Sequence, residues 1–286
     1  MEKSTMERYA ALLIDACIGL RGGDRLRIAG EPCARPFMYV LAETAYRRGA
    51  RQVRLEYPDP SLERIFVDNV REDWVEDISA LAKREADCLV EEGWSYLRLT
   101  GEERPGALEG ADPSRLQRSS RARSMARKSL IEAQMSNRLI WCVAPLPTAA
   151  WGSRVFEDAG RKAPADPEAA LLGELLPILR LDDAEPGAVV LSHAREIEAR
   201  ARRLDALSLS ELHFQGPGTE LRVGLSRRSR WVGGGSRTPE GRYFLPNHPT
   251  EEVFTSPDAR RTEGRAACSR PVEVLGAKVE GAWFEF

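Results

Sequence analysis

The chain has 286 residues, enough for one large domain or two smaller ones, and 42 Lys and Arg against 44 Asp and Glu give a formal net charge of −2. This near balance offers no whole-chain attraction to nucleic acid or to an anionic membrane. The five cysteines are scattered and never form a Cys-x-x-Cys pair, which favours reduced thiols over a disulfide framework or a zinc ribbon. Charges interrupt the first residues and no apolar run approaches the length of a membrane helix, so we expect a cytoplasmic protein with neither nucleic acid nor a membrane as partner.

The first half of the chain alternates between helical and extended patterns. Residues 5–20 place their apolar side chains on one helical face, residues 26–29 form a short strand, and a helix over 36–48 precedes a strand over 53–57. This strand–helix–strand order predicts a parallel α/β unit. The further elements predicted in this half are a helix over 72–84, strands over 88–90 and 96–99, a helix over 114–135 and a strand over 139–144.

The second half begins with helices and ends with strands. Helical patterns cover 167–179 and 189–207, and after residue 208 short strand-forming runs separated by Gly and Pro dominate. We therefore predict an α/β domain over residues 1–208 and a β-rich domain over residues 209–286. The predicted strands of the second domain are 212–214, 221–225, 253–255, 272–275 and 282–286.

The most informative motif places two adjacent carboxylates, Glu251 and Glu252, after a turn that prolines 246 and 249 restrain. If residues 251–255 are extended, neighbouring side chains point to opposite faces, so the two glutamates cannot play the same part. One of them then suits a metal ligand and the other a supporting group. The alternative from the residues alone is a pair of solvated charges at a strand edge.

Three segments together resemble the metalloaminopeptidase family of aminopeptidase T and aminopeptidase S. They are the turn Gly216–Leu221, the tryptophan–glycine stretch Trp231–Gly235 and the segment Asn247–Thr255, which reads Asn-His-Pro-Thr-Glu-Glu-Val-Phe-Thr. The resemblance continues to the N-terminus, where residues 9–23 and 42–50 look like the first two helices of the family. It covers essentially the whole chain.

The resemblance implies an enzyme that removes N-terminal residues from peptides, uses two divalent ions, zinc or cobalt, and forms a homo-oligomer, typically a dimer. By this resemblance Glu252 is a metal ligand and Glu251 is its neighbour. The family uses further ligands, namely another glutamate, histidines, an aspartate and a tyrosine, that have no counterpart in residues 1–286. We therefore expect a β-rich domain of the catalytic type that is cut short, and a chain that is inactive or nearly so on its own.

Two other functions remain open at this point. A non-catalytic binding or assembly protein on the same scaffold would use exposed strand edges to recruit a partner or a second copy. A ring-cleaving iron oxygenase on a related scaffold would need a His-rich facial triad, which the three histidines of this sequence do not form.

The histidines have simpler interpretations than metal binding. His248 is expected to have a surface or packing role, although it lies three residues before Glu251. His213 alternates with apolar neighbours in a strand and is expected to face solvent. His193, near the start of a charged helix, is expected to be a capping or surface residue.

Glycine and arginine clusters also favour structural roles. Residues 216–218 and 233–235 lie among strands with no helix N-terminus after them, so turn geometry explains them better than a phosphate loop. The arginines of the 114–135 helix are spread around it without aromatic residues. They indicate a solvated or inter-domain helix in preference to RNA binding.

Overall fold

The computed structural model describes residues 1–274 and 277–286 and divides into two compact units. Unit 1 comprises Met1–Ser192 and Gly235–Pro249, and unit 2 comprises His193–Gly234 and Thr250–Phe286. Helix α9 (Pro186–Ala206) begins in unit 1 and ends in unit 2. The predicted domain boundary near residue 208 falls just after this helix, so the compact units are divided differently from the predicted domains.

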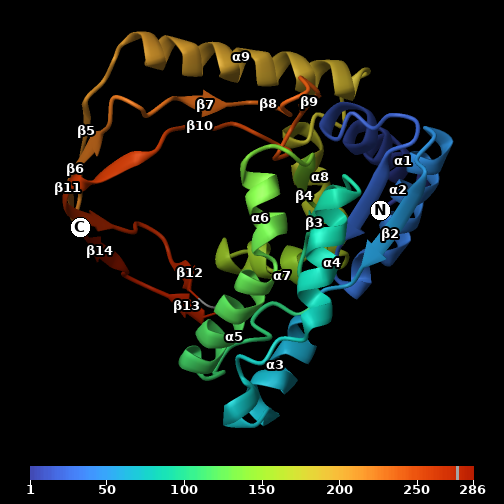
Figure 1. The fold of residues 1–286 in the computed structure, drawn as a ribbon, viewed down its shortest axis with the longest axis horizontal. Helices are drawn as coiled ribbons and strands as arrows, with labels where there is room; N and C mark the ends of the chain where they lie inside the picture. The colour runs from blue at the N-terminus through green and yellow to red at the C-terminus, as the bar shows by residue number, and fades with distance from the viewer. Residues whose placement is uncertain (275–276) are drawn as a thin grey trace. The chain divides into compact units, whose positions relative to one another are not determined.

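Unit 1 is built on a parallel four-stranded sheet, as the strand–helix–strand pattern predicts (Figure 1). Its strands are ordered β2-β1-β3-β4, and they are β1 (Arg25–Ala29), β2 (Gln52–Glu56), β3 (Ser95–Thr100) and β4 (Trp141–Pro145). The short strands β8 (Ser236–Arg237) and β9 (Tyr243–Phe244) pair with each other. The helices around the sheet are α1 (Lys3–Ala11), η1 (Leu12–Cys17), η2 (Pro32–Ala34), α2 (Arg35–Arg47), α3 (Pro60–Asn69), η3 (Glu72–Trp74), α4 (Ala80–Glu91), α5 (Pro113–Ala126), α6 (Lys128–Met135), α7 (Ala149–Asp158) and α8 (Pro167–Ile178).

Local capping chemistry explains where several of these helices begin. The side chains of Asp59, Asp112, Thr148 and Asp166 each accept a hydrogen bond from a backbone N–H of the first turn of α3, α5, α7 and α8. Such caps satisfy donors that the helix itself leaves without a partner. Proline in the first turn of α3, α5 and α8 adds a preset φ where no backbone donor is required.

Three predicted elements of unit 1 were wrong, and one of them, the single helix over 114–135, is the two helices α5 and α6. The helix predicted over 72–84 is the short turn η3 followed by α4, because the Ser79 hydroxyl accepts a hydrogen bond from Leu81 N and starts a new helix there. The strand predicted over 88–90 is the last turn of α4. A short apolar run does not distinguish a strand from a buried helix face. Helices α3 and α7 were not predicted.

The two faces of the parallel sheet differ in chemistry. One face carries apolar side chains that are almost fully buried, among them Leu26, Leu97 and Cys142. The next residues along the strands point to the opposite face, where Arg27 and Tyr96 lie side by side in register. A parallel sheet is normally apolar on both faces, so Arg27 at its centre is unusual.

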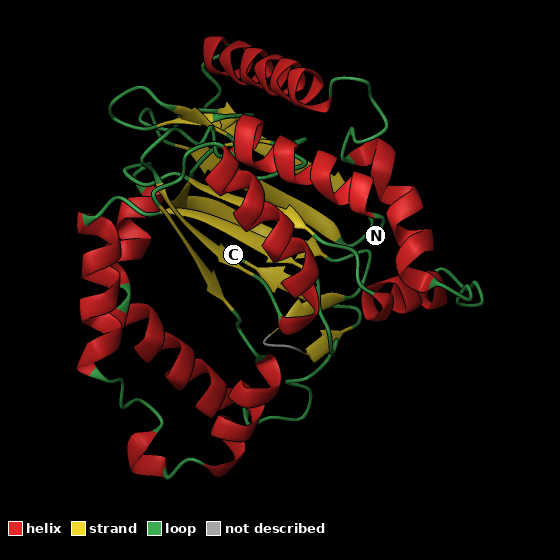
Figure 2. Ribbon diagram, turned by 90° about the vertical axis from the view of Figure 1, so that its right-hand side faces the viewer, coloured by secondary structure: helices red, strands yellow, loops and turns green. Residues whose placement is uncertain are grey.

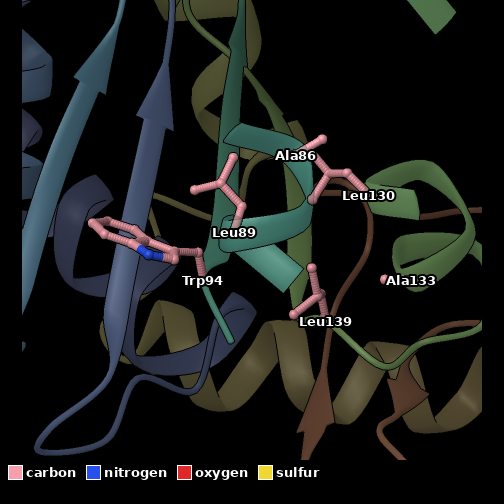
Figure 3. Packing of buried hydrophobic residues seen from close by; sticks show 6 residues of the cluster. All are labelled: Ala86, Leu89, Trp94, Leu130, Ala133 and Leu139. Atoms are coloured by element: carbon pink, nitrogen blue, oxygen red, sulfur yellow. The ribbon is translucent and has the colours of Figure 1, made fainter. Parts of the chain in front are cut away.

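Helices α4 and α6 pack together and complete the core beside the sheet. Figure 3 shows the apolar side chains that they bury, which come from α4, α6 and the segments that lead into β3 and β4. The cluster consists of Ala86, Leu89, Trp94, Leu130, Ala133 and Leu139. In the described part of the chain, no helix combines the length and apolar character that crossing a membrane requires.

Unit 2 contains an antiparallel sheet of order β14-β11-β6-β5, as the prediction of a β-rich second part requires. Strands are drawn in yellow in Figure 2. The 216–218 turn joins β5 to β6, as predicted. The mixed α/β class is therefore confirmed. The strands of this unit are β5 (Glu211–Gly216), β6 (Thr219–Leu225), β7 (Val232–Gly233), β10 (Val253–Phe254), β11 (Pro257–Ala267), β12 (Val272–Val274), β13 (Ala277–Val279) and β14 (Trp283–Glu285).

Strand β11 was not predicted, although it is the longest strand described. Its sequence is rich in charge and contains Pro257 and Gly264, which local propensity disfavours in a strand. Pairing with β6 on one side and β14 on the other supplies the hydrogen bonds that hold it extended. The predicted strand over 272–275 matches β12, except that residue 275 lies outside the described residues.

Candidate metal centre

The segment that precedes the glutamate pair is fixed by backbone hydrogen bonds to β4. Val143 N donates to Pro246 O at 2.8 Å, and His248 N donates to Val143 O at 2.9 Å. Residue Asn247 forms a parallel bridge to Val143 between these two bonds. Residues 246–248 thus extend the parallel sheet of unit 1 as a short additional strand segment.

His248 is a buried residue of unit 1, only 3% exposed, with its ring 6.0 Å from that of Tyr9. Burial lowers its pKa to about 4, against the opposing effect of a hydrogen bond with the backbone of Leu179. Of the surface or packing role predicted for His248, the burial supports packing and contradicts a surface position. Its Nε2 has no hydrogen-bond partner among the described residues.

Glu251 and Glu252 lie in unit 2, directly before β10. Glu251 Oε2 lies 2.8 Å from His193 Nε2 on α9, a contact between residues 58 positions apart. The side chain of His193 is 21% exposed and that of Glu251 is 56% exposed. His193 was expected to cap a helix or to face solvent, and the sequence carries no signal that would have paired it with Glu251.

The backbone next to Glu252 is held by a close approach to the glycine stretch. Val253 pairs with Gly233 in the β10–β7 ladder, and a Cβ on Gly233 would lie 2.5 Å from Glu252 O. At Gly234, φ is +76° and a Cβ would lie 2.2 Å from Ala194 O of α9. Close packing of β7 against β10 and α9 therefore explains Gly233 and Gly234, where the sequence predicted turn geometry.

His213 lies on β5 with an exposed side chain, as predicted, and contacts the carboxylate of Glu211 two residues away. A hydrogen bond with the His213 ring lowers the pKa of Glu211. This pair lies on one strand of the antiparallel sheet and includes neither Glu251 nor Glu252.

The three comparisons with known proteins agree on one class. The family model described as thermophilic metalloprotease (M29) matches residues 2–286, and the chain therefore belongs to this family. The recognition made from the motifs is confirmed, and family membership supports the prediction of an enzyme. A metalloprotease family implies a divalent metal ion as its cofactor.

Relatives of known name cover nearly all of this chain. It is 33% identical to "Aminopeptidase T" of Thermus thermophilus over 289 residues, which cover 99% of this chain and 69% of that protein. It is 31% identical to "Aminopeptidase PepS" of Streptococcus thermophilus over 281 residues, covering 98% and 67%. The solved structure "Wild-type AmpT from Thermus thermophilus" superposes with a TM-score of 0.83 at 33% identity, covering 99% of this chain and 69% of that one. Because these matches span almost the whole chain, they do not support the prediction of a domain that is cut short.

The donors brought together here do not by themselves fit a metal ion. Carboxylate and imidazole groups are suitable ligands for zinc or cobalt. Among the described residues, however, no three His, Cys, Asp or Glu side chains form a group that could hold a metal. Glu251 Oε2 and His193 Nε2 lie 2.8 Å apart, whereas a site with two ions needs a bridging carboxylate and several further ligands.

Proposed function

We propose that this protein acts as an aminopeptidase that removes N-terminal residues from peptides. The observation that carries the proposal is the family match over residues 2–286, together with relatives named aminopeptidase T and aminopeptidase PepS. Peptides are the proposed substrates, and two divalent ions, zinc or cobalt, are the cofactors that the resemblance implies.

Within this function we propose Glu252 as a metal ligand and Glu251 as its neighbour. The side chains of both are exposed on the segment before β10, and the contact with His193 orients Glu251. No group of three or more His, Cys, Asp or Glu side chains among the described residues could hold a metal ion, so Glu251 and Glu252 need additional ligands to bind one. Activity of the chain on its own is then expected to be low.

The test compares the purified chain of residues 1–286 with a fusion to the part of Thermus thermophilus aminopeptidase T that this chain does not cover. Release of para-nitroaniline from Leu-para-nitroanilide is measured with zinc or cobalt and again with a chelator, alongside elemental analysis for bound metal. We expect little activity and little metal in the chain alone, and chelator-sensitive activity in the fusion. Strong chelator-sensitive activity in the chain alone would contradict the proposed shortage of ligands.

Variants of the glutamate pair test the assignment of the ligand. Glu252→Gln in the active form is expected to abolish activity and to lower the metal content, because an amide is a much weaker ligand than a carboxylate. Asp258→Asn, an acidic residue at the start of β11, is the control and should leave both the activity and the metal content unchanged. Full activity of Glu252→Gln would contradict the assignment of Glu252 as a metal ligand.

A second candidate function, a non-catalytic binding or assembly protein, is favoured by one observation. Aromatic side chains on or beside the strands of unit 2 are exposed, namely Phe214, Phe254, Trp283, Phe284 and Phe286. Exposed apolar side chains on strands favour association. A homo-oligomer, most simply a dimer, is proposed on this ground, and light scattering tests it, since a monomer at all concentrations argues against both the dimer and the assembly function.

A cytoplasmic location is also proposed. All five cysteines are unpaired thiols in the described structure, and an odd, scattered set of reduced thiols suits a reducing compartment. Immunoblotting of fractionated cells of the source organism checks this, and recovery in the medium would contradict it.

A further inference from the structure

The polar face of the parallel sheet in unit 1 borders a cavity of about 240 Å³. None of the candidate metal ligands lines this cavity. Strands β1 and β2 form one wall, α4 forms a second, and the end of α5 closes a third. Apolar residues of α4, including Leu89 of the cluster in Figure 3, complete the lining. The charged residues of the lining are four arginines and two glutamates, Arg27, Arg54, Arg123, Arg127, Glu56 and Glu85.

Arg27 is a buried lining residue of this cavity, at 1% exposure. Its Nε and Nη2 donate to Glu56 Oε1 and Oε2 at 2.8 and 3.0 Å, and its guanidinium carbon lies 4.8 Å from the centre of the Tyr96 ring. Its Nη1 is buried and has no hydrogen-bond partner among the described residues. A buried charged donor without an acceptor is strongly unfavourable, so an acceptor bound inside the cavity would stabilise Arg27 Nη1.

The other arginines differ in how far their charge is already compensated. Arg54 pairs with Glu85 and lies 3.6 Å from Glu56, and Arg123 pairs with Glu63 of α3. Arg127, exposed at the junction of α5 and α6, has no carboxylate within ion-pair distance among the described residues. The lining therefore keeps an excess of positive charge.

The lowered pKa of Glu56 supports an excess of positive charge in the lining. Burial by itself would raise the pKa of Glu56, yet the hydrogen bonds from Arg27 and the charges of Arg27, Arg54 and Arg127 lower it below its usual value. Glu56 thus stays ionised and holds two of the donors of Arg27. The third guanidinium nitrogen of Arg27, Nη1, and the charge of Arg127 remain available.

We propose that this cavity binds a small oxyanion, of the phosphate or carboxylate class, through Arg27 Nη1 and the guanidinium of Arg127. Arginine suits such ligands because its donors form a planar fork that matches two oxygens of one anion. The cavity is far larger than the space of roughly 30 Å³ that one water occupies in the liquid, so an anion fits together with several waters. Water alone would satisfy Arg27 Nη1 but would leave the excess positive charge uncompensated.

The experiment measures the binding of inorganic phosphate and of acetate to the full chain at constant pH and ionic strength, with chloride as the reference. Equilibrium dialysis gives the stoichiometry, and the shift of the thermal midpoint gives a second readout. We expect one phosphate or one acetate per chain. Arg127→Ala should weaken binding by roughly tenfold through the loss of one charge-assisted contact.

Arg121→Ala is the matched control, because Arg121 is exposed on the same helix and is not among the lining residues. It should bind like the parent chain. Arg27→Met tests the buried donor. If this variant does not fold, the binding measured with Arg127→Ala still tests the proposal, because Arg127 is exposed. Tighter binding of phosphate than acetate assigns a phosphate ligand, and the reverse assigns a carboxylate. No binding of either anion, or binding that Arg127→Ala leaves unchanged, overturns the proposal.

Discussion

The two units bury their apolar residues to very different extents. In unit 1 a parallel sheet carries one face of buried, mostly apolar side chains, and helices pack a further apolar cluster beside it. In the described part of unit 2, the nearly fully buried apolar residues are Ala194, Ile197, Ala201 and Leu225. Hydrophobic burial is the dominant favourable contribution to folding, so unit 1 has the stronger source of stability.

The glutamates proposed as ligands lie in the unit with the smaller core. Backbone ladders, glycine packing and one His–Glu contact position them, while large apolar side chains contribute little. Binding and catalytic residues often lie on loops, which a rigid, well-packed scaffold holds in position. The comparison predicts large effects of core substitutions in unit 1 and smaller, local effects in unit 2.

The largest effect is expected from Leu97→Ala in β3. Leu97 is fully buried, so its truncation removes apolar contacts and leaves a cavity, at a cost of about 4 kcal/mol in the free energy of unfolding. Leu81→Ala on exposed α4 surface is the control and should change stability by less than about 0.5 kcal/mol. Urea unfolding followed by circular dichroism measures both, and a small effect of Leu97→Ala would mean that unit 1 is not dominated by its core.

The next effect is a pH dependence that His248 introduces into unit 1. Its pKa is about 4 in the folded chain and roughly 6.5 in the unfolded chain, so the unfolded chain binds the extra proton more readily. Stability from this group is fully present above pH ~6.5 and is lost as the pH falls toward 4, by roughly 3 kcal/mol in total.

His248→Gln should remove this dependence, whereas His213→Gln, an exposed control, should retain it. Unfolding free energies at pH 7, 5.5 and 4.5 provide the measurement. Equal slopes in the parent chain and in His248→Gln would show that His248 does not titrate in a buried environment.

A smaller effect is expected from Gly233→Ala in unit 2. The new Cβ would lie 2.5 Å from Glu252 O, so β7 and β10 must move apart, at a cost of about 2 kcal/mol. Gly216→Ala is the matched control, because a Cβ there meets nothing within 4 Å. Thermal unfolding reports the stability, and loss of activity of Gly233→Ala in the active fusion would additionally link this packing to Glu252.

The smallest effect on the free energy of unfolding is expected when the contact between Glu251 and His193 is removed. Since the Glu251 side chain is 56% exposed, solvent screens the contact, and its coupling energy should be below about 1 kcal/mol. A double-mutant cycle of Glu251→Gln and His193→Gln measures it. A coupling of several kcal/mol would show instead that the pair is desolvated and rigid, as a structural core contact would be.

Local sequence pattern predicted much of unit 1 but less of unit 2. The helices 36–48 and 167–179 and the strands 26–29, 53–57 and 96–99 lie within a few residues of α2, α8, β1, β2 and β3. Periodic apolar side chains and helix-capping residues act within a few positions of each other, so the sequence shows them directly. Strand β11 and the small core of unit 2 follow from pairing with distant strands, which no local pattern reveals.

The sequence by itself determined the family, the alternation of helices and strands in the first half, and the glutamate pair as the candidate ligands. Motifs and periodicity are properties of neighbouring residues, and they survive in a single sequence. Only the tertiary structure decided that His193 meets Glu251, that His248 is buried against Tyr9, and that Arg27 is left with an unsatisfied donor beside Arg127. These contacts join residues far apart in the chain, and their energies depend on burial and on opposing charges that exist only after folding.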